Sequence, residues 1–314
     1  MKNKPILIVP GDPKSIFFEI FFKSLKSNRL KSPLILITSL NIFKHQMKRF
    51  KFNKSFKLIN LNELNNNSFF KSAINIINVD YDRKKKPKTY IKKSFEIAFK
   101  ILKTNLTNKF LNGPINKTKF LDKKYLGITE YIAAEFRISK IAMLIYNKDL
   151  SVCPLTTHLP IRLVSKSINQ KLIEEKIELI NNFFKKNIGF KPKIAIVGLN
   201  PHCESILKYK EDEKIVFPAV KSLKKKGYKV YGPFPADTIF LKQNRKKYNV
   251  VLGMYHDQVL SPIKALKEYN AINITLGVPF FRVSPDHGPN EKMINKNLSN
   301  PLSLIKAMKF LDQR

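Results

Sequence analysis

Cysteine, glycine and long apolar runs are all scarce in this sequence of 314 residues. Its two cysteines cannot form a disulfide framework or a four-thiolate zinc site, so we expect a reducing, cytoplasmic setting. No stretch approaches the roughly 18 consecutive apolar residues that a membrane-spanning helix needs. Because 43% of the residues are hydrophobic and only 10 are glycine, the composition excludes collagen-like, low-complexity and disordered proteins.

Acidic residues are also few: 23 Asp and Glu stand against 59 Lys and Arg, which gives a formal net charge of +36. Such a charge is typical of nucleic-acid-binding proteins. The basic residues, however, are mostly lysine, are spread over the whole chain and accompany abundant Ile, Asn and Phe. We interpret the charge as drift in the composition of a solvated surface and expect no specific nucleic-acid or membrane partner. A positive field would also attract a phosphorylated substrate.

The glycine-rich motifs of many nucleotide-binding proteins are missing as well. Neither G-x-G-x-x-G nor G-x-x-x-x-G-K-[ST] occurs, so no Rossmann fingerprint or P-loop holds a nucleotide here. The few glycines lie instead in short polar clusters such as PGDP at 10–13, NGP at 112–114 and DHG at 286–288. These clusters predict sharp turns or places where the backbone approaches a ligand closely.

Short β-branched runs alternate along the chain with patterns of helical spacing. The runs predict strands buried on both faces, at residues 6–9, 34–38, 141–146, 194–198, 250–253 and 272–276. Apolar residues at three- and four-residue spacing predict helices over 90–103 and 171–186. This alternation predicts an α/β protein with mostly parallel sheets. We expect a first lobe from residues 1–130 and 277–314, a second from 131–276, and an active site in the cleft between them.

Three of the five histidines, His158, His202 and His256, follow stretches with strand character. Ligands of open α/β sheets bind at the carboxyl ends of the strands. Three imidazoles without a fourth protein ligand are typical of a catalytic divalent-metal site with an open position. Asp257 and Asp237 are placed to orient the ligands or to complete the coordination. The other interpretation, that each histidine caps a strand end or packs as a neutral side chain, is equally compatible with the spacing.

Cationic and hydroxyl side chains near the same turns could clamp an anion: Lys117, Thr129, Lys264 and Arg282. A guanidinium such as that of Arg282 binds a carboxylate or phosphate bidentately. Asn273 lies in a strand that looks buried, where its amide needs a partner. Solvated lysines and a backbone contact of Asn273 are the alternative interpretations.

Eleven short sequence strings, in one order and nearly from end to end, resemble the 4-hydroxythreonine-4-phosphate dehydrogenase family. They are VPGDP at 9–13, GPINK at 113–117, TE at 129–130, TTHLP at 156–160, GLNPH at 198–202, GP at 232–233 with PADT at 235–238, MYHDQ at 254–258, NITLG at 273–277, PF at 279–280, Arg282 and DHG at 286–288. The resemblance implies a two-lobed fold like that of isocitrate and isopropylmalate dehydrogenases.

The implied activity is the NAD(P)-linked oxidation, with decarboxylation, of 4-phosphooxy-L-threonine to 3-amino-2-oxopropyl phosphate in pyridoxine 5'-phosphate biosynthesis. The resemblance further implies a divalent cation (zinc, magnesium or cobalt) and a homodimer with shared active sites. It assigns the metal ligands, then the substrate contacts, then the catalytic proton-relay or orienting groups: His158, His202 and His256; Thr129, Lys264, Asn273 and Arg282; Lys117 and Asp237. It assigns no cofactor-binding residue.

Three segments depart from the family pattern. Residues 14–18 replace glycines of the first loop, and residues 203–208 replace a glycine-rich stretch after His202. Ile128 stands where the family usually has a histidine, and an apolar side chain cannot donate a hydrogen bond to a phosphate. These departures keep two alternatives open: the same oxidation of a phosphorylated four-carbon sugar acid without the amine, or a catalytically impaired, basic polyanion-binding protein.

Overall fold

The computed structural model describes residues 3–27, 29–65, 69–82, 84, 86–116, 120–121, 124–205 and 210–314. Tertiary contacts group the chain into two compact units. Unit 1 comprises Met1–Lys123 and Pro279–Arg314, and unit 2 comprises Lys124–Val278. The predicted boundaries between the lobes follow residues 130 and 276, whereas the boundaries between these units follow residues 123 and 278.

Unit 1 contains a sheet of parallel strands in the order β3-β4-β2-β1-β5-β12. The strands are β1 (Ile6–Val9), β2 (Leu34–Thr38), β3 (Phe56–Leu58), β4 (Ile74–Asn78), β5 (Lys109–Asn112) and β12 (Phe281–Pro285). The central strands β1 and β2 are fully buried. Helices on both faces of a parallel sheet remove its strands from water, which is why these strands are continuous apolar runs.

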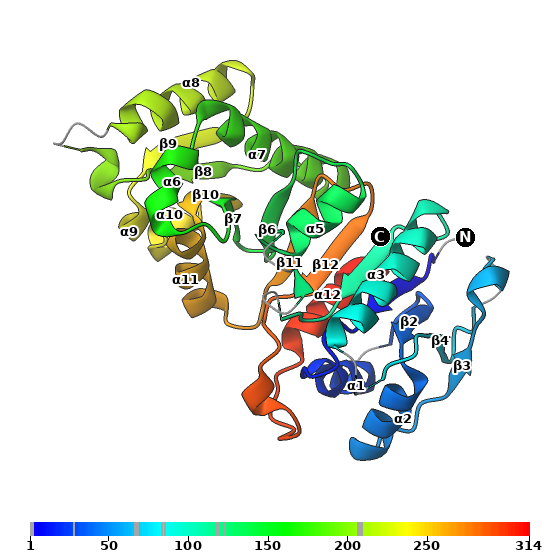
Figure 1. Cartoon of the computed structure of the whole chain (residues 1–314). Helices are drawn as coiled ribbons and strands as arrows, with labels where there is room; N and C mark the ends of the chain where they lie inside the picture. Colours follow the sequence, from blue (N-terminus) through cyan, green and yellow to red (C-terminus); the bar gives the residue numbers. More distant parts are fainter. Residues whose placement is uncertain are drawn as a thin grey trace. The chain divides into compact units, whose positions relative to one another are not determined.

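The helices of unit 1 lie on both faces of this sheet (Figure 1). They are α1 (Phe17–Ser27), α2 (Leu40–Arg49), α3 (Pro87–Lys103) and α12 (Leu302–Asp312), with 3₁₀ turns at Leu61–Glu63 and Glu291–Met293. Right-handed crossovers place α1 and α2 on one face and α3 on the other, because α3 connects strands in the opposite direction along the sheet. The helix α12 packs on α1 and on β12.

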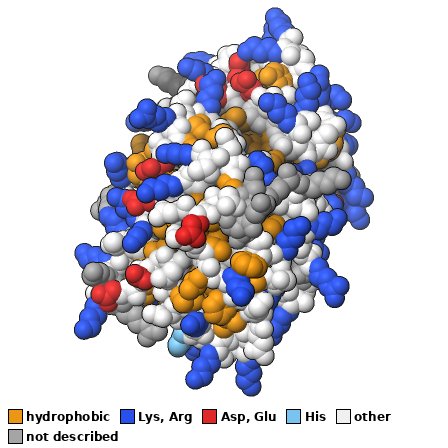
Figure 2. Space-filling view, turned by 90° about the vertical axis from the view of Figure 1, so that its right-hand side faces the viewer, with side chains coloured by type: hydrophobic (Ala, Val, Ile, Leu, Met, Phe, Trp, Pro, Cys, Tyr) orange, Lys and Arg blue, Asp and Glu red, His pale blue; other side chains and the backbone are white. Residues whose placement is uncertain are grey.

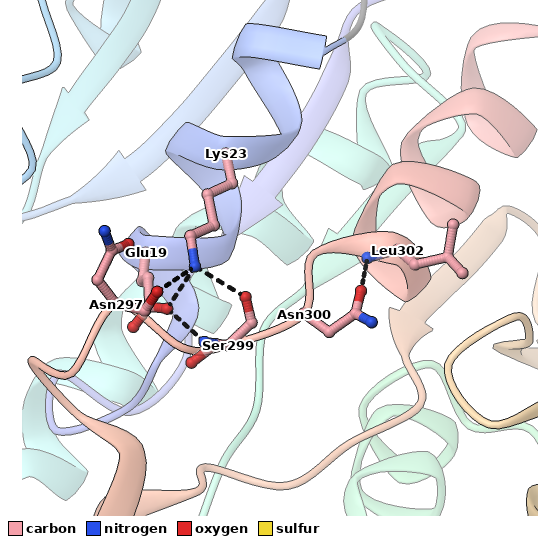
Figure 3. Close-up of polar contacts among 6 residues, drawn as sticks. All are labelled: Glu19, Lys23, Asn297, Ser299, Asn300 and Leu302. Atoms are coloured by element: carbon pink, nitrogen blue, oxygen red, sulfur yellow. Dashed lines mark hydrogen bonds and ion pairs between the residues drawn. The ribbon is translucent and has the colours of Figure 1, made fainter.

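An ion pair between the buried Glu19 and the half-buried Lys23 fastens the C-terminal part of unit 1 to α1 (Figure 3). The Glu19 carboxylate, 2% exposed, accepts hydrogen bonds from Lys23 Nζ at 2.9 Å and from the Ser299 amide at 2.6 Å. Lys23 also donates to the carbonyl oxygens of Asn297 and Ser299, at 2.8 and 3.0 Å. The two side chains of α1 therefore hold the segment before α12 through its backbone carbonyl and amide groups.

Unit 2 contains a mixed sheet in the order β11-β6-β7-β10-β8-β9. The strands are β6 (Ala142–Tyr146), β7 (Ser151–Thr156), β8 (Ile194–Val197), β9 (Val230–Phe234), β10 (Val250–Tyr255) and β11 (Ile272–Leu276). The strands β7, β10, β8 and β9 are parallel, whereas β6 runs antiparallel to β7 and β11. The carboxyl ends of β7, β10 and β8 consequently lie at one edge of the sheet.

The helices of unit 2 enclose an aliphatic core that includes Val152, Val197, Val251, Val259 and Ile263. They are α5 (Ile128–Glu135), α6 (Ile161–Ser167), α7 (Gln170–Phe183), α8 (Phe217–Lys225), α9 (Ala236–Ile239), α10 (Lys242–Arg245) and α11 (His256–Lys267), with further helical turns at Phe184–Ile188, Pro201–Cys203 and Asp212–Val216. The predicted α/β class and mostly parallel sheets are confirmed. Among the described helices, none combines the length and the apolar character that crossing a membrane requires.

Candidate active site

Two of the predicted metal ligands meet at the carboxyl edge of the sheet in unit 2. The strands β7 and β10 are parallel neighbours, with Thr156 opposite Tyr255. His158 follows the end of β7, and His256 begins α11 directly after β10. The ring centroids of His158 and His256 are 5.6 Å apart. The topology of the sheet therefore brings together two histidines that are distant in sequence.

Asp257 is placed to orient the imidazole of His256. Its Oδ1 lies 2.7 Å from Nδ1 of His256, and both side chains are in contact with solvent. A carboxylate that accepts a hydrogen bond from Nδ1–H selects the tautomer in which the Nε2 lone pair can bind a metal. His256 with Asp257 thus has the arrangement that a metal-ligating histidine usually has.

His202, the third predicted ligand, lies in the 3₁₀ turn Pro201–Cys203 after β8. The described residues of one chain contain no group of three or more His, Cys, Asp or Glu side chains that could hold a metal ion. A single chain therefore pairs His158 with His256 and leaves His202 outside that pair. Asp237, on α9, is exposed.

The backbone is strained at two of the three histidines. His158 has φ of 53° and His202 has φ of 57°, in the left-handed region that side chains with a Cβ rarely adopt. Each such residue costs on the order of 1–3 kcal/mol and persists only where its surroundings hold it. Strain of this kind concentrates at functional sites, so it marks both histidine turns as candidates.

A buried carboxylate shapes the turn before His202. Asp212 accepts hydrogen bonds from the Leu199 amide at 2.7 Å, from the Asn200 amide at 2.9 Å and from Asn200 Nδ2 at 3.0 Å. A Cβ on Gly198 would lie 2.8 Å from Cys203 Sγ and 2.9 Å from Asp212 Oδ1, so only glycine fits there. Asp212 does not belong to the strings that carry the family resemblance. Its signal in the sequence is an acidic triplet, Glu211 to Glu213, in a chain with few acids.

Next to His158 lies a small pocket of about 20 Å³, whose lining combines apolar residues with Glu130, Thr157, His158 and Lys176. Such a volume holds about one water molecule. Glu130 Oε1 accepts a hydrogen bond from Thr157 Oγ1 at 3.0 Å, and Oε2 is buried with no hydrogen-bond partner among the described residues. Burial lowers the pKa of Lys176, and the nearby charge of Glu130 opposes that shift. Nothing in the sequence marks Lys176 as a functional residue, because the chain contains so many lysines.

The predicted substrate contacts are found in both units. Thr129 is half-buried at the start of α5 and Lys264 is half-buried on α11. In β11, the Oδ1 atom of Asn273 is buried with no hydrogen-bond partner among the described residues, so it can accept a bond from a ligand. Arg282 in β12 is buried and donates from Nε to Asn112 Oδ1 at 2.8 Å. Lys117, the other predicted catalytic residue, lies outside the described residues.

Ile128 and Cys203 lie in two of the segments that depart from the family pattern. Ile128 is buried at the start of α5, next to Thr129, and offers no donor to an anion. Burial raises the pKa of the Cys203 thiol, a hydrogen bond with the Gly198 backbone lowers it, and the charges of Asp212, Glu204 and Asp237 raise it.

Lysine and arginine side chains are dispersed over the face of the molecule that Figure 2 shows. Uncharged side chains and a few acidic ones lie between them. On this face the described basic residues do not gather into one continuous patch, which agrees with a solvated basic surface.

The α/β units, built around mostly parallel strands, have the isocitrate dehydrogenase type of fold. The chain aligns with isocitrate dehydrogenase from Methylococcus capsulatus with a TM-score of 0.52 and 10% identity, over 98% of this chain and 84% of the other. Residues 26–311 match the family described as Pyridoxal phosphate biosynthetic protein PdxA, and the chain belongs to this family.

Relatives and solved structures agree with this assignment. A 4-hydroxythreonine-4-phosphate dehydrogenase of Sulfurihydrogenibium sp. (strain YO3AOP1) is 35% identical over 97% of this chain and 96% of the relative. A D-threonate 4-phosphate dehydrogenase of Pectobacterium atrosepticum is 31% identical over 91% of each protein. The crystal structure of 4-hydroxythreonine-4-phosphate dehydrogenase from Klebsiella pneumoniae superposes with a TM-score of 0.81 and 28% identity, over 98% of each chain. The predicted family and fold are thereby confirmed, and the chain is an NAD(P)-dependent dehydrogenase.

Proposed function

We propose that this dehydrogenase oxidises 4-phosphooxy-L-threonine, with decarboxylation to 3-amino-2-oxopropyl phosphate, as a step of pyridoxine 5'-phosphate biosynthesis in the cytoplasm. The observation that carries the proposal is the pairing of His158 with His256 at the carboxyl edge of the sheet, with Asp257 on Nδ1 of His256. The relative from Sulfurihydrogenibium, which is named for this substrate, supports it.

The donor set fits a divalent cation held by His158, His202 and His256. Imidazole nitrogens suit zinc or cobalt better than magnesium, which prefers oxygen ligands. Asp257 keeps the Nε2 lone pair of His256 available for this role. When bound, the cation would polarise the substrate hydroxyl and the nicotinamide of NAD or NADP would accept the hydride.

We further propose that the site is completed in a homodimer. Within the described residues of one chain His202 stays outside the pair of His158 and His256, so a second copy is the simplest source of the third ligand. Isologous dimers form two equivalent sites of this kind.

The other side chains would grip and orient the substrate. The Asn112 amide fixes Nε of Arg282, so the guanidinium is held in one orientation for an anionic group. Asn273 Oδ1 would accept a hydrogen bond from an ammonium or hydroxyl group, while Thr129 and Lys264 would bind oxygen atoms of the substrate. Lys117 and Asp237 are the proposed proton-relay or orienting groups.

The test uses the purified protein, stripped of metal and then supplied with zinc, cobalt or magnesium, with NADH or NADPH formation as the signal. His256→Ala should lower kcat/KM by more than about 100-fold, because even partners of metal ligands contribute up to that much. His45→Ala, which changes an exposed histidine on α2, is the matched control and should retain activity. Undiminished turnover without metal would contradict the proposal.

Mixing two inactive variants tests the shared site. His202→Ala and His256→Ala chains, unfolded and refolded together, form dimers in which one site keeps all three histidines if His202 comes from the partner. Part of the activity should then return. If all three ligands come from one chain, no mixed dimer has an intact site and activity stays lost.

A second substrate, D-threonate 4-phosphate, is favoured by one observation. Ile128 is buried where the family usually has a histidine, and relatives named for D-threonate 4-phosphate match over more than nine-tenths of the chain. The two substrates differ in carrying an amine or a hydroxyl, so kcat/KM measured side by side decides between them.

A further inference from the structure

We propose that Gln258 is a positioning residue whose side-chain amide holds the turn of His202 against the turn of His256. The proposal rests on the proposed metal-dependent function, because it concerns the turns of His202 and His256 in one chain, each of which supplies a ligand to one of the two sites of the proposed dimer. The resemblance includes Gln258 in its MYHDQ string but assigns it no role.

The amide of Gln258 makes two short hydrogen bonds to different strand ends. Its Oε1 accepts from the Met254 amide in β10 at 2.7 Å, and its Nε2 donates to the Gly198 carbonyl after β8 at 2.7 Å. Gln258 is the third residue of α11 and follows His256 by two positions. Gly198 precedes His202 by four residues, so a single side chain connects the backbones that lead to both histidines.

Gly253 in β10 leaves room for the side chains at the start of α11. A Cβ on Gly253 would lie 2.4 Å from Val259 Cγ1 and 3.1 Å from Gln258 Oε1. A larger residue at 253 would therefore displace the Val259 side chain and, to a smaller extent, the Gln258 amide.

A further hydrogen bond connects β10 to the turn of His158. Thr156 Oγ1, two residues before His158, donates to the Met254 carbonyl at 2.8 Å. Met254 therefore has its amide bound by Gln258 and its carbonyl bound by Thr156. Since β10 lies between β7 and β8 in the sheet, these side chains connect the ends of the three strands that lead to His158, His256 and His202.

The chemistry of the bridge requires an amide. One end must accept a hydrogen bond from the Met254 amide and the other must donate one to the Gly198 carbonyl. A carboxylate cannot do both because it only accepts. Gln258→Glu keeps the size of the side chain but faces the Gly198 carbonyl with a second acceptor. Gln258→Met keeps the length and removes both bonds.

The first measurement is the affinity of the metal-free protein for zinc alone, by competition with a chelator. Gln258→Glu should weaken zinc binding about tenfold, the lower end of losses caused by changes around metal ligands, and Gln258→Met should weaken it at least as much. Gln243→Glu makes the same substitution at an exposed glutamine of the same unit and should leave the affinity unchanged. Zinc affinity of Gln258→Glu equal to that of the wild type would overturn the proposal.

The second measurement is hydrogen–deuterium exchange, which needs no metal. Amides of residues 199–205 should exchange faster in Gln258→Glu than in Gln243→Glu, while those of β7 should be unchanged. If the wild type takes up no zinc, the proposed function fails, yet the exchange still decides the role of Gln258: faster exchange supports the bridge and equal exchange refutes it. A variant that merely unfolds would exchange rapidly in β7 too, in which case Gln258→Met supplies the same comparison.

Discussion

The two units of the chain use their interiors differently. In unit 1, large rings pack together: Phe22 stacks on Phe52 with centroids 4.3 Å apart and lies at 5.9 Å from Phe43. In unit 2, the core beneath the histidine turns is mainly aliphatic, and the polar side chains concentrate at one edge of the sheet. The two left-handed histidines, the hydrogen bonds from Asp212 to the turn before His202, and the small pocket next to His158 all belong to unit 2. The aromatic core therefore serves mainly the stability of unit 1, whereas the candidate metal ligands lie in unit 2; the predicted substrate contact Arg282 lies in unit 1.

The largest expected difference between the units is the loss of stability when the aromatic core of unit 1 is truncated. Phe43 is the buried residue of α2 and is 0% exposed, so Phe43→Ala should lower the free energy of unfolding by about 3–5 kcal/mol. Denaturant unfolding measures the loss. Phe70→Ala, which changes a half-exposed ring of the same unit, should cost much less. Zinc affinity of folded Phe43→Ala should match the wild type, and a parallel loss of zinc binding would break the division between the units.

The next effect is expected in the turn of His202. Asp212→Asn replaces a carboxylate oxygen that accepts a backbone amide with a donor, which should cost about 1–3 kcal/mol of stability. The same variant should weaken zinc binding, because the turn that carries His202 loses its anchor. Asp149→Asn, at a side chain that is 74% exposed, is the matched control and should change neither quantity appreciably. Normal zinc affinity in Asp212→Asn would show that this anchor serves stability alone.

The smallest effect is a pH dependence on the outer surface of unit 2. The hydrogen bond from Lys226, at 2.5 Å, lowers the pKa of Glu174 from its ordinary 4.5 to about 2. A carboxyl whose pKa is lower in the folded state stabilises the fold above pH 4.5 and loses that contribution as the pH falls from 4.5 towards 2.

Lys226→Met should therefore flatten the dependence of unfolding on pH in this window, without changing zinc binding at neutral pH. Thermal unfolding at several pH values measures it. Lys225→Met changes an exposed lysine of the same helix and should leave the slope as in the wild type. An unchanged slope in Lys226→Met would show that the surface pair contributes nothing.

Much of the fold could be predicted because buried parallel strands are continuous apolar runs. The predicted strand 6–9 coincides with β1, and the predicted helix 90–103 lies within α3. The edge strand β3 escaped prediction because its Lys57 and Leu58 are exposed and only three residues form it. The strand β5 escaped it because it begins with Lys109, which is buried through its hydrogen bond to Ser32 Oγ at 2.9 Å.

The sequence names candidate residues for the site but does not indicate the hydrogen bonds between them. His158 and His256 stand out because each follows a predicted strand, and the sheet brings them together. Gln258, Asp212 and Lys176 have roles that depend on which strand ends and helices become neighbours. The acidic triplet around Asp212 and the string that contains Gln258 mark these two residues in the sequence, but they do not indicate which backbone groups each side chain binds, and Lys176 is one of many lysines.

The amino-acid sequence alone establishes the α/β class and the family, because apolar periodicity and short motifs are local properties of a chain. That His158 and His256 lie together, whereas His202 lies outside this pair within the described residues of one chain, follows only from the fold. The reason is that the pairing of β7 with β10 makes neighbours of two strand ends that lie far apart in the sequence, and local apolar periodicity does not encode which strands become neighbours.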